Sequence, residues 1–106
     1  FVRWTVVEKK TNAAIGTVEM FQSEDQENGE ACGILRIDLA SNYEKKPYLR
    51  EILSIAVDNF YLNFKVSHIL TKTFPDALER TECLYEAGFL PLGKLFRGEY
   101  EGYYIR

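Results

Sequence analysis

Residues 34–64 consist of an apolar segment, a short polar segment and a long segment with helical periodicity, in that order. The apolar segment, residues 34–39, is too hydrophobic for a strand with one wet face, although Arg36 and Asp38 interrupt it on one side. Beyond the polar segment, apolar residues recur at three- and four-residue spacing, which predicts an amphipathic helix with one buried face. These residues are Leu49, Ile52, Leu53, Ala56, Val57, Phe60 and Phe64.

The polar segment, residues 40–46, carries Asn42, Lys45 and Lys46, and Pro47 follows it. The fixed φ of proline suits the first position of a helix, so Pro47 marks the predicted helix start. A strand, a loop and a helix in this order place backbone amides and cations at a helix N-terminus, where an anion can bind. The polar segment is therefore a candidate anion site.

The remaining chain divides into further strands and one more helix. Two early strands form a hairpin through a polar turn, whereas we interpret the acidic run at residues 23–30 as a solvated loop. Pro75 and Asp76 open a second helix, with Thr73 as a candidate cap, and Gly88 ends it in the left-handed conformation. The predicted strands are residues 2–7, 14–21, 32–40, 66–74, 89–96 and 99–105.

This order of elements, βββαβαββ, predicts an α+β fold in which a mixed sheet is flanked by two helices. The first helix connects two strands, residues 32–40 and 66–74, that must be parallel if the helix is their crossover. They form a right-handed central βαβ unit. At 106 residues the chain is long enough for one hydrophobic core and too short for two, so a single domain is expected.

Charge and composition argue against several functional classes. The net charge of −3 and the unbalanced acidic run argue against nucleic-acid binding. No run approaches the roughly 20 apolar residues of a membrane span and no signal peptide is recognisable, so we expect no membrane association and a cytoplasmic location. Cys32 and Cys83 lie far apart, without the spacing of a zinc site, and no metal site is predicted. The chain starts at Phe1 without Met, which suggests that upstream sequence is missing or was never required.

Three segments carry a resemblance to a known superfamily: residues 15–18 in the second strand, residues 39–49 between strand and helix, and Leu84 to Phe89 at the end of the second helix. In these segments the chain resembles the GNAT superfamily of N-acetyltransferases, and within it the branch that acetylates ribosomal-protein N-termini. The resemblance covers nearly all of residues 1–106 as one acyltransferase domain. This sequence has no counterpart of the superfamily's first strand and first two helices. In the superfamily these elements build much of the acceptor side of the substrate cleft.

The resemblance implies that acetyl-CoA is the co-substrate and that it enters a gap where the two parallel strands splay apart. The main chain of Leu39 and Ala40 would pair with the pantetheine arm as an added strand does. The loop and helix start would hold the pyrophosphate, but Glu44 is acidic, Pro47 lacks an N–H and Leu49 is bulky where close approach needs a small residue. The implied cofactor-binding residues are Leu39, Ala40, Glu44, Lys45, Lys46, Tyr48, Leu49 and Arg50.

Three residues are candidates for proton transfer. Tyr85 lies one position after the place where the superfamily often carries a tyrosine that protonates the leaving thiolate. It acts as this acid only if the helix register shifts by one, and the alternative is a half-buried aromatic with its hydroxyl in water. Asp38 and Glu19 lie on strands that would face the cleft. Each is expected either to relay a proton from the amine or to be an exposed strand carboxylate with no such role.

Two functions remain open at this point. The first is an acetyl-CoA-dependent N-acetyltransferase acting on an amine acceptor, with catalysis by proximity and oxyanion stabilisation. The second is a degenerate GNAT-fold module that senses a ligand or binds a protein, which the departures at Glu44, Pro47 and Leu49 favour. A homodimer through the final, tyrosine-rich strands is compatible with either function.

Overall fold

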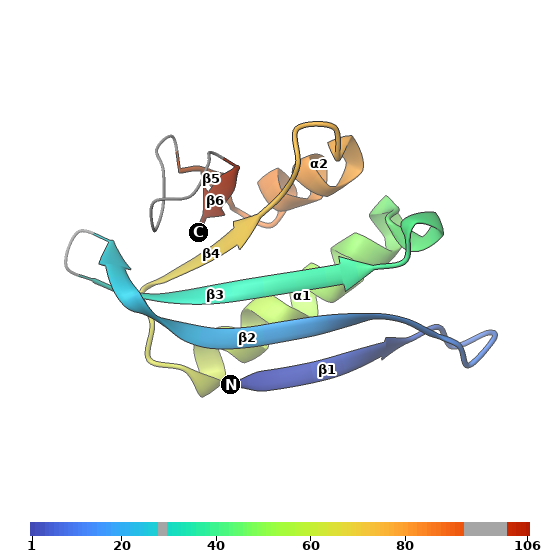
Figure 1. Cartoon of the computed structure of the whole chain (residues 1–106), viewed down its shortest axis with the longest axis horizontal. Helices are drawn as coiled ribbons and strands as arrows, with labels where there is room; N and C mark the ends of the chain where they lie inside the picture. Colours follow the sequence, from blue (N-terminus) through green and yellow to red (C-terminus); the bar gives the residue numbers. More distant parts are fainter. Residues whose placement is uncertain (28–29, 93–101) are drawn as a thin grey trace.

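The computed structural model describes residues 1–27, 30–92 and 102–106. Within these residues the chain forms a six-stranded sheet, two α-helices and one short 3-10 turn (Figure 1). In chain order the elements are β1 (Val2–Val7), β2 (Ala14–Glu27), β3 (Glu30–Leu39), the turn η1 (Ser41–Tyr43), α1 (Lys46–Asn63), β4 (His68–Lys72), α2 (Leu78–Glu86), β5 (Leu90–Pro91) and β6 (Tyr103–Ile105). The predicted βββαβαββ order is confirmed.

The strands follow one another across the sheet in the order β1-β2-β3-β4-β6-β5. β3 and β4 lie at the centre and are parallel, and the other neighbouring strands are antiparallel. α1 connects β3 to β4, which is the crossover that a parallel pair requires (Figure 1). The predicted α+β fold with one central parallel crossover is therefore confirmed.

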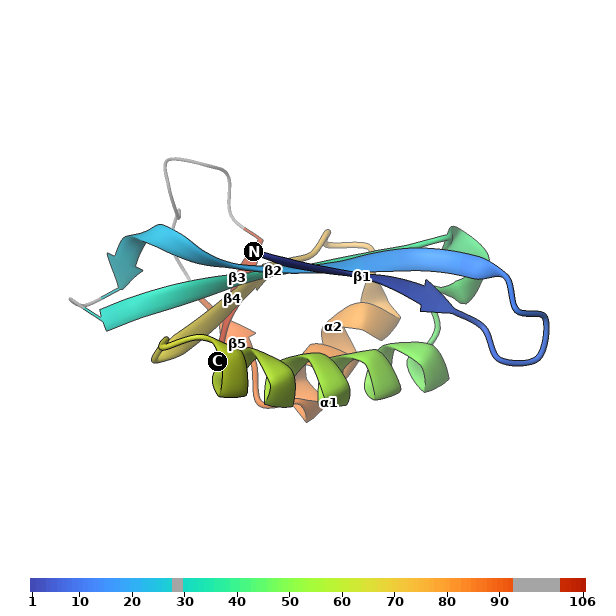
Figure 2. The same cartoon turned by 90° about the horizontal axis from the view of Figure 1, so that it is seen from below.

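Both helices lie against the same face of the sheet, as the view along the sheet shows (Figure 2). Because side chains alternate along a strand, one set from β2 and β3, including Val18 and Leu35, points into a core shared with α1. α1 buries a matching stripe at the predicted spacing, which consists of Leu49, Leu53, Ala56, Val57 and Phe60. Each large side chain buried in this way contributes about 1.5–3 kcal/mol, so α1 and the sheet stabilise each other.

Gly33 determines how closely α1 approaches the sheet. It lies in β3 opposite Ile69 of β4, inside the parallel pairing. A Cβ atom at position 33 would lie 2.3 Å from the fully buried ring of Phe60, so only glycine leaves room for that ring. The glycine thereby brings α1 into direct contact with the centre of the sheet.

The acidic run is placed differently from the prediction. β2 continues to Glu27 and β3 begins at Glu30, so most of the run predicted as a loop belongs to strand β2. A register shift between Gln22 and Gln26 accommodates the extension. The predicted strands at residues 89–96 and 99–105 overlap β5 and β6, and the positions between them, 97–98, lie outside the described residues.

The second helix begins later than predicted. The chain first forms a turn in which Ala77 N–H donates to Phe74 O at 3.0 Å. The N-cap is therefore Ala77, whose methyl side chain makes no cap bond. Thr73 therefore does not cap the helix. At the other end Gly88 has a φ of +93°, which confirms the predicted left-handed stop.

The cysteines and acidic residues of the described ranges form no metal cluster. Cys32 and Cys83 are buried free thiols, and no three His, Cys, Asp or Glu side chains in these ranges gather as metal ligands. Neither described helix combines the length and the hydropathy that crossing a membrane requires.

Candidate functional site

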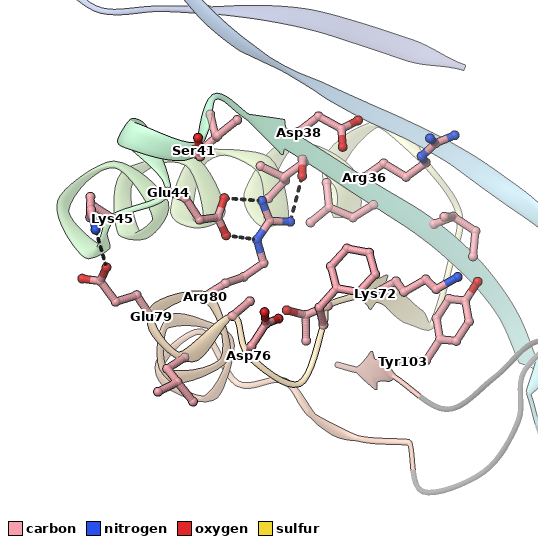
Figure 3. Close-up of a pocket in the computed structure, with 18 of the residues that line it drawn as sticks. Arg36, Asp38, Ser41, Glu44, Lys45, Lys72, Asp76, Glu79, Arg80 and Tyr103 are labelled. Carbon is pink, nitrogen blue, oxygen red and sulfur yellow. Dashed lines mark hydrogen bonds and ion pairs between the residues drawn. The ribbon is translucent and has the colours of Figure 1, made fainter.

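The two parallel central strands separate soon after they begin to pair. Their register ends at Ile34 of β3 and Leu70 of β4. One residue further, a side chain makes the bridge, since Thr71 Oγ1 donates to Leu35 O at 2.8 Å. Beyond this bridge a cavity of about 1030 Å³ lies between β3, the end of β4, the loop before α1 and the start of α2 (Figure 3). The gap expected between splayed parallel strands is therefore present.

The backbone hydrogen bonds show which residues of β3 face this cavity. Ala40 N–H donates to Ile15 O at 2.9 Å, so Ala40 faces β2. Because backbone groups alternate along a strand, the N–H and C=O groups of Leu39 and Ile37 point the opposite way, and both residues line the cavity. The Ala40 amide, which the resemblance implied would pair with the pantetheine arm, is bonded to β2 in this structure. Ile37, two residues before Leu39, was not predicted, although strand alternation alone relates the two.

Arg80 of α2 joins three elements at the loop end of the cavity. Its guanidinium donates to both carboxylate oxygens of Glu44, at 2.6 and 2.7 Å, and to Ile37 O at 2.7 Å (Figure 3). The Arg80 side chain is only 13% exposed and the Glu44 side chain 25%. Glu44 therefore does not present an uncompensated negative charge to the cavity, and Arg80 occupies one acceptor on the β3 edge. Sequence analysis did not select Arg80.

Each cation predicted to bind pyrophosphate is paired with a carboxylate of α2. The Lys45 pair measures 3.5 Å, and the Arg50 pair is bidentate with N–O distances of 2.7 and 3.0 Å. The acidic partners recur at three- and four-residue spacing, a helical stripe that the sequence contained but that was not noticed. The pairs are Lys45 with Glu79, Lys46 with Glu82 and Arg50 with Glu86.

The ion pairs shift the pKa values of their members. The hydrogen bond to Glu82 raises the pKa of Lys46 above its usual range, and the bond to Glu86 raises that of Arg50. The same bond from Arg50 lowers the pKa of Glu86. All three groups stay charged at neutral pH, so an anionic ligand would meet cations that already have partners.

Tyr48 and Leu49, which were predicted as cofactor-binding residues, are not among the described residues that line the cavity. Tyr48 Oη donates to Glu8 Oε2 at 2.6 Å, in the hairpin between β1 and β2. This bond raises the pKa of Tyr48 and lowers that of Glu8. Leu49 is fully buried in the core beneath α1, which begins at Lys46, one residue before the predicted proline start.

The two predicted strand carboxylates are placed differently. Asp38 is exposed and lines the cavity, as Figure 3 shows. Glu19 lies on β2 between Arg3 and Arg36, at 3.9 and 3.8 Å, and does not line the cavity among the described residues. Of these two predicted carboxylates, only Asp38 lines the cavity in the described part of the chain.

Tyr85 does not reach the cavity either. It lies on α2, is half exposed, and packs edge-on against Tyr104 of β6 with ring centroids 5.7 Å apart. Burial and the hydrogen bond to Tyr85 raise the pKa of Tyr104. In this structure Tyr85 is a packed, half-exposed aromatic whose side chain interacts with Tyr104.

One buried polar atom at the cavity lacks a partner. Thr73, directly after β4, lines the cavity and is 5% exposed. Its Oγ1 has no hydrogen-bond partner among the described residues. Unpaired buried hydroxyls are rare in folded proteins, so this atom points to a ligand group in the cavity.

A mixed sheet whose central parallel strands separate over a cavity is the arrangement of the GNAT acetyltransferases, and comparison with solved structures shows that the chain has this fold. Ribosomal-protein-S5-alanine acetyltransferase from Vibrio fischeri aligns with 97% of this chain at 21% identity and a TM-score of 0.71. Spermidine N-acetyltransferase from Vibrio cholerae, in complex with CoA and spermine, aligns with 97% of the chain at 18% identity and a TM-score of 0.68.

The NatC complex bound to Gag peptide and CoA aligns equally fully, at 18% identity and a TM-score of 0.70. The chain spans 58%, 62% and 67% of the lengths of these three solved chains, so it corresponds to a part of each. No protein-family model and no curated protein matches the sequence. The similarity therefore establishes the fold, and function rests on the site.

Proposed function

We propose that this chain is the acyl-CoA-binding part of an N-acetyltransferase that transfers an acetyl group to an amine. The observation that carries this proposal is the cavity of about 1030 Å³ into which the β3 edge at Ile37 and Leu39 opens. An edge of this kind can pair with an extended amide-containing arm, as an added strand would. The orphaned hydroxyl of Thr73 supports a polar ligand at the same place.

The loop end of the cavity suits the charged part of such a ligand. Lys45 lines the cavity and is the N-cap of α1, where the helix dipole contributes about 0.3–1 kcal/mol towards binding an anion. Pro47 is the second helical residue and donates no N–H, so fewer amides are available than at an ordinary helix start. We therefore assign phosphate binding to Lys45 and the remaining amides, with Lys46 near by.

Acyl-CoA supplies an activated acyl group, whose carbonyl carbon forms a bond to the amine nitrogen as its bond to sulfur breaks. The amine loses one proton in this reaction and the released sulfur gains one. Asp38 is the acceptor we assign for the amine proton, because its exposed carboxylate lines the cavity. The cavity walls contribute by holding both reactants in position.

The second candidate function is a non-catalytic module of the same fold. It is favoured by the paired cations and by Arg80, which already occupies Ile37 O and both oxygens of Glu44. Such a module would retain the cavity as a ligand sensor or present its surface to a protein. A homodimer through β5 and β6 accompanies either candidate as a separate proposal, which sedimentation at high concentration tests.

Calorimetric titration of the chain with acetyl-CoA, desulfo-CoA and ADP, followed by acetyl-transfer assays on a panel of amines, separates the candidates. Micromolar binding together with turnover that Asp38→Asn abolishes supports the transferase. Binding without turnover supports the sensor. No detectable binding up to millimolar acetyl-CoA, in a chain shown to be folded by circular dichroism, would overturn both the transferase and the ligand sensor. The protein-interaction module would then be the remaining candidate.

A further inference from the structure

Two threonines on one strand differ in how their hydroxyls are satisfied. Thr71 is 3% exposed, and its Oγ1 donates to Leu35 O at 2.8 Å. Thr73, two residues later, is 5% exposed, and its Oγ1 has no partner among the described residues. The backbone of Thr73 is held in place, since its N–H donates to Gly102 O at 3.0 Å. A fixed, buried and unpaired hydroxyl costs stability unless something else binds it.

The position of Thr73 indicates which part of a ligand would bind it. Continuing the register of β3 and β4 places Thr73 at the level of Ile37, past the last bridge between the strands. Lys45 lines the cavity from the loop before α1, where the charge favours phosphates. The cavity lining includes the apolar Phe21, Ile34 and Phe74, and close to Thr73 in the sequence it also includes Lys72 and Asp76. A ligand end that carries a hydrogen-bond acceptor next to an apolar group fits a buried hydroxyl beside Phe74.

We propose that Thr73 Oγ1 binds the sulfur end of acyl-CoA and donates a hydrogen bond to the thiolate that leaves. This inference rests on the proposed transferase function. It assigns the contact with the leaving sulfur to Thr73 and not to Tyr85, which is half exposed on α2. A hydroxyl that donates to a thiolate stabilises the charge that develops on sulfur as the carbon–sulfur bond breaks. The hydroxyl keeps its proton, and the sulfur is later protonated by water.

The test uses three variants and two ligands. Thr73→Val removes the hydroxyl but keeps the shape, Thr73→Ser keeps the hydroxyl, and Thr71→Val is the matched control on the same strand. Free CoA and desulfo-CoA differ only at the sulfur. Calorimetry at about pH 7 and about pH 9 brackets the ionisation of an ordinary thiol near 8.5, and thermal unfolding of the ligand-free chain is recorded in parallel.

We expect Thr73→Val to weaken CoA binding about tenfold at the higher pH, because a charge-assisted bond is lost. The effect should be smaller at the lower pH and absent for desulfo-CoA, and Thr73→Ser should restore binding. Without ligand, Thr73→Val should raise the unfolding midpoint by about 4 °C, because an unpaired buried hydroxyl is removed. Thr71→Val should lower the midpoint, because Leu35 O loses its donor.

Three results would overturn this assignment. Equal weakening of CoA and desulfo-CoA would place the hydroxyl against another part of the ligand. A lower midpoint for ligand-free Thr73→Val would show that the hydroxyl has a partner in the free protein. Wild-type affinity retained by Thr73→Val would remove Thr73 from the site while leaving the transferase function intact, whereas failure of the wild-type chain itself to bind CoA would reject both.

Discussion

Arg80 and Glu44 form a bidentate ion pair, with N–O distances of 2.6 and 2.7 Å, that ties α2 to the loop before α1. The third bond of Arg80, to Ile37 O, extends this connection to β3. Both side chains are largely buried, so solvent screens the pair less than a surface pair. The pair therefore shapes the loop end of the cavity as well as stabilising it.

A double-mutant cycle with Arg80→Met and Glu44→Gln measures this connection. Each single change should destabilise the chain by about 1–3 kcal/mol, because it leaves a partly buried polar group without its partner. The double variant should recover part of this loss, with a coupling of about 0.5–3 kcal/mol. Urea unfolding provides the free energies.

The control for this cycle is the bidentate pair Arg50–Glu86, which has similar distances but side chains that are 53% and 47% exposed. We expect a smaller coupling for Arg50→Met with Glu86→Gln, because water screens an exposed pair. Equal couplings in the two cycles would show that burial of Arg80 adds nothing.

The carboxylates of α2 should compete with an anionic ligand for the cations of α1. Glu79→Gln with Glu82→Gln frees Lys45 and Lys46 and should tighten ADP and CoA binding severalfold in calorimetry at low salt. Glu51→Gln with Asp58→Asn is the control, because it changes the net charge equally through exposed positions elsewhere on α1. Similar tightening in both variants would indicate a general charge effect and no phosphate site at the loop.

The bond between Tyr48 and Glu8 should make stability depend on pH at both extremes. The pKa of Glu8 is lowered below 4.5, so its contribution is present above that value and is lost as pH falls through the folded pKa. The pKa of Tyr48 is raised above 10.0, so its contribution is present below that value and is lost as pH rises through the folded pKa.

Tyr48→Phe should therefore lower stability at neutral pH and flatten both limbs of the pH profile of urea unfolding. Tyr43→Phe removes a longer bond to Glu8, of 3.5 Å, and should have a smaller effect. An unchanged profile in Tyr48→Phe would contradict the pairing.

Gly33→Ala should destabilise the chain by about 1–3 kcal/mol, because the added methyl group collides with the Phe60 ring. Phe60→Leu alone creates a cavity and is also destabilising. The double variant should be more stable than the sum of the two single effects predicts, since leucine leaves room for the methyl group. Strict additivity in chemical denaturation would show that residues 33 and 60 do not compete for this space.

The arrangement of the elements follows from periodicity in the sequence. The buried stripe from Leu49 to Phe60 and the glycine stop at Gly88 are local patterns, and the parallel pairing follows from the length of the crossover helix. The extension of β2 to Glu27 was missed because acidic residues are poor strand formers, and pairing with β3 overrides that preference.

The site was predictable only in part, because its contacts join residues far apart in the sequence. Leu39 and Asp38 were selected through the resemblance to the superfamily, and both line the cavity. Arg80 was missed because its three acceptors lie 36 and 43 residues away. A charge on one helix face does not reveal its partner until the fold brings the two helices together.

The buried thiol of Cys83 lies between α1 and α2, where its Sγ is 4.0 Å from Lys46 O. Burial raises the pKa of this thiol and keeps alkylating reagents away from it. In a Cys32→Ser chain, the rate of alkylation at Cys83 would therefore report how often the two helices part. Cys83 is thus an internal reporter of how often the interface between α1 and α2 opens. Mass spectrometry can measure its alkylation without a probe attached to the cavity.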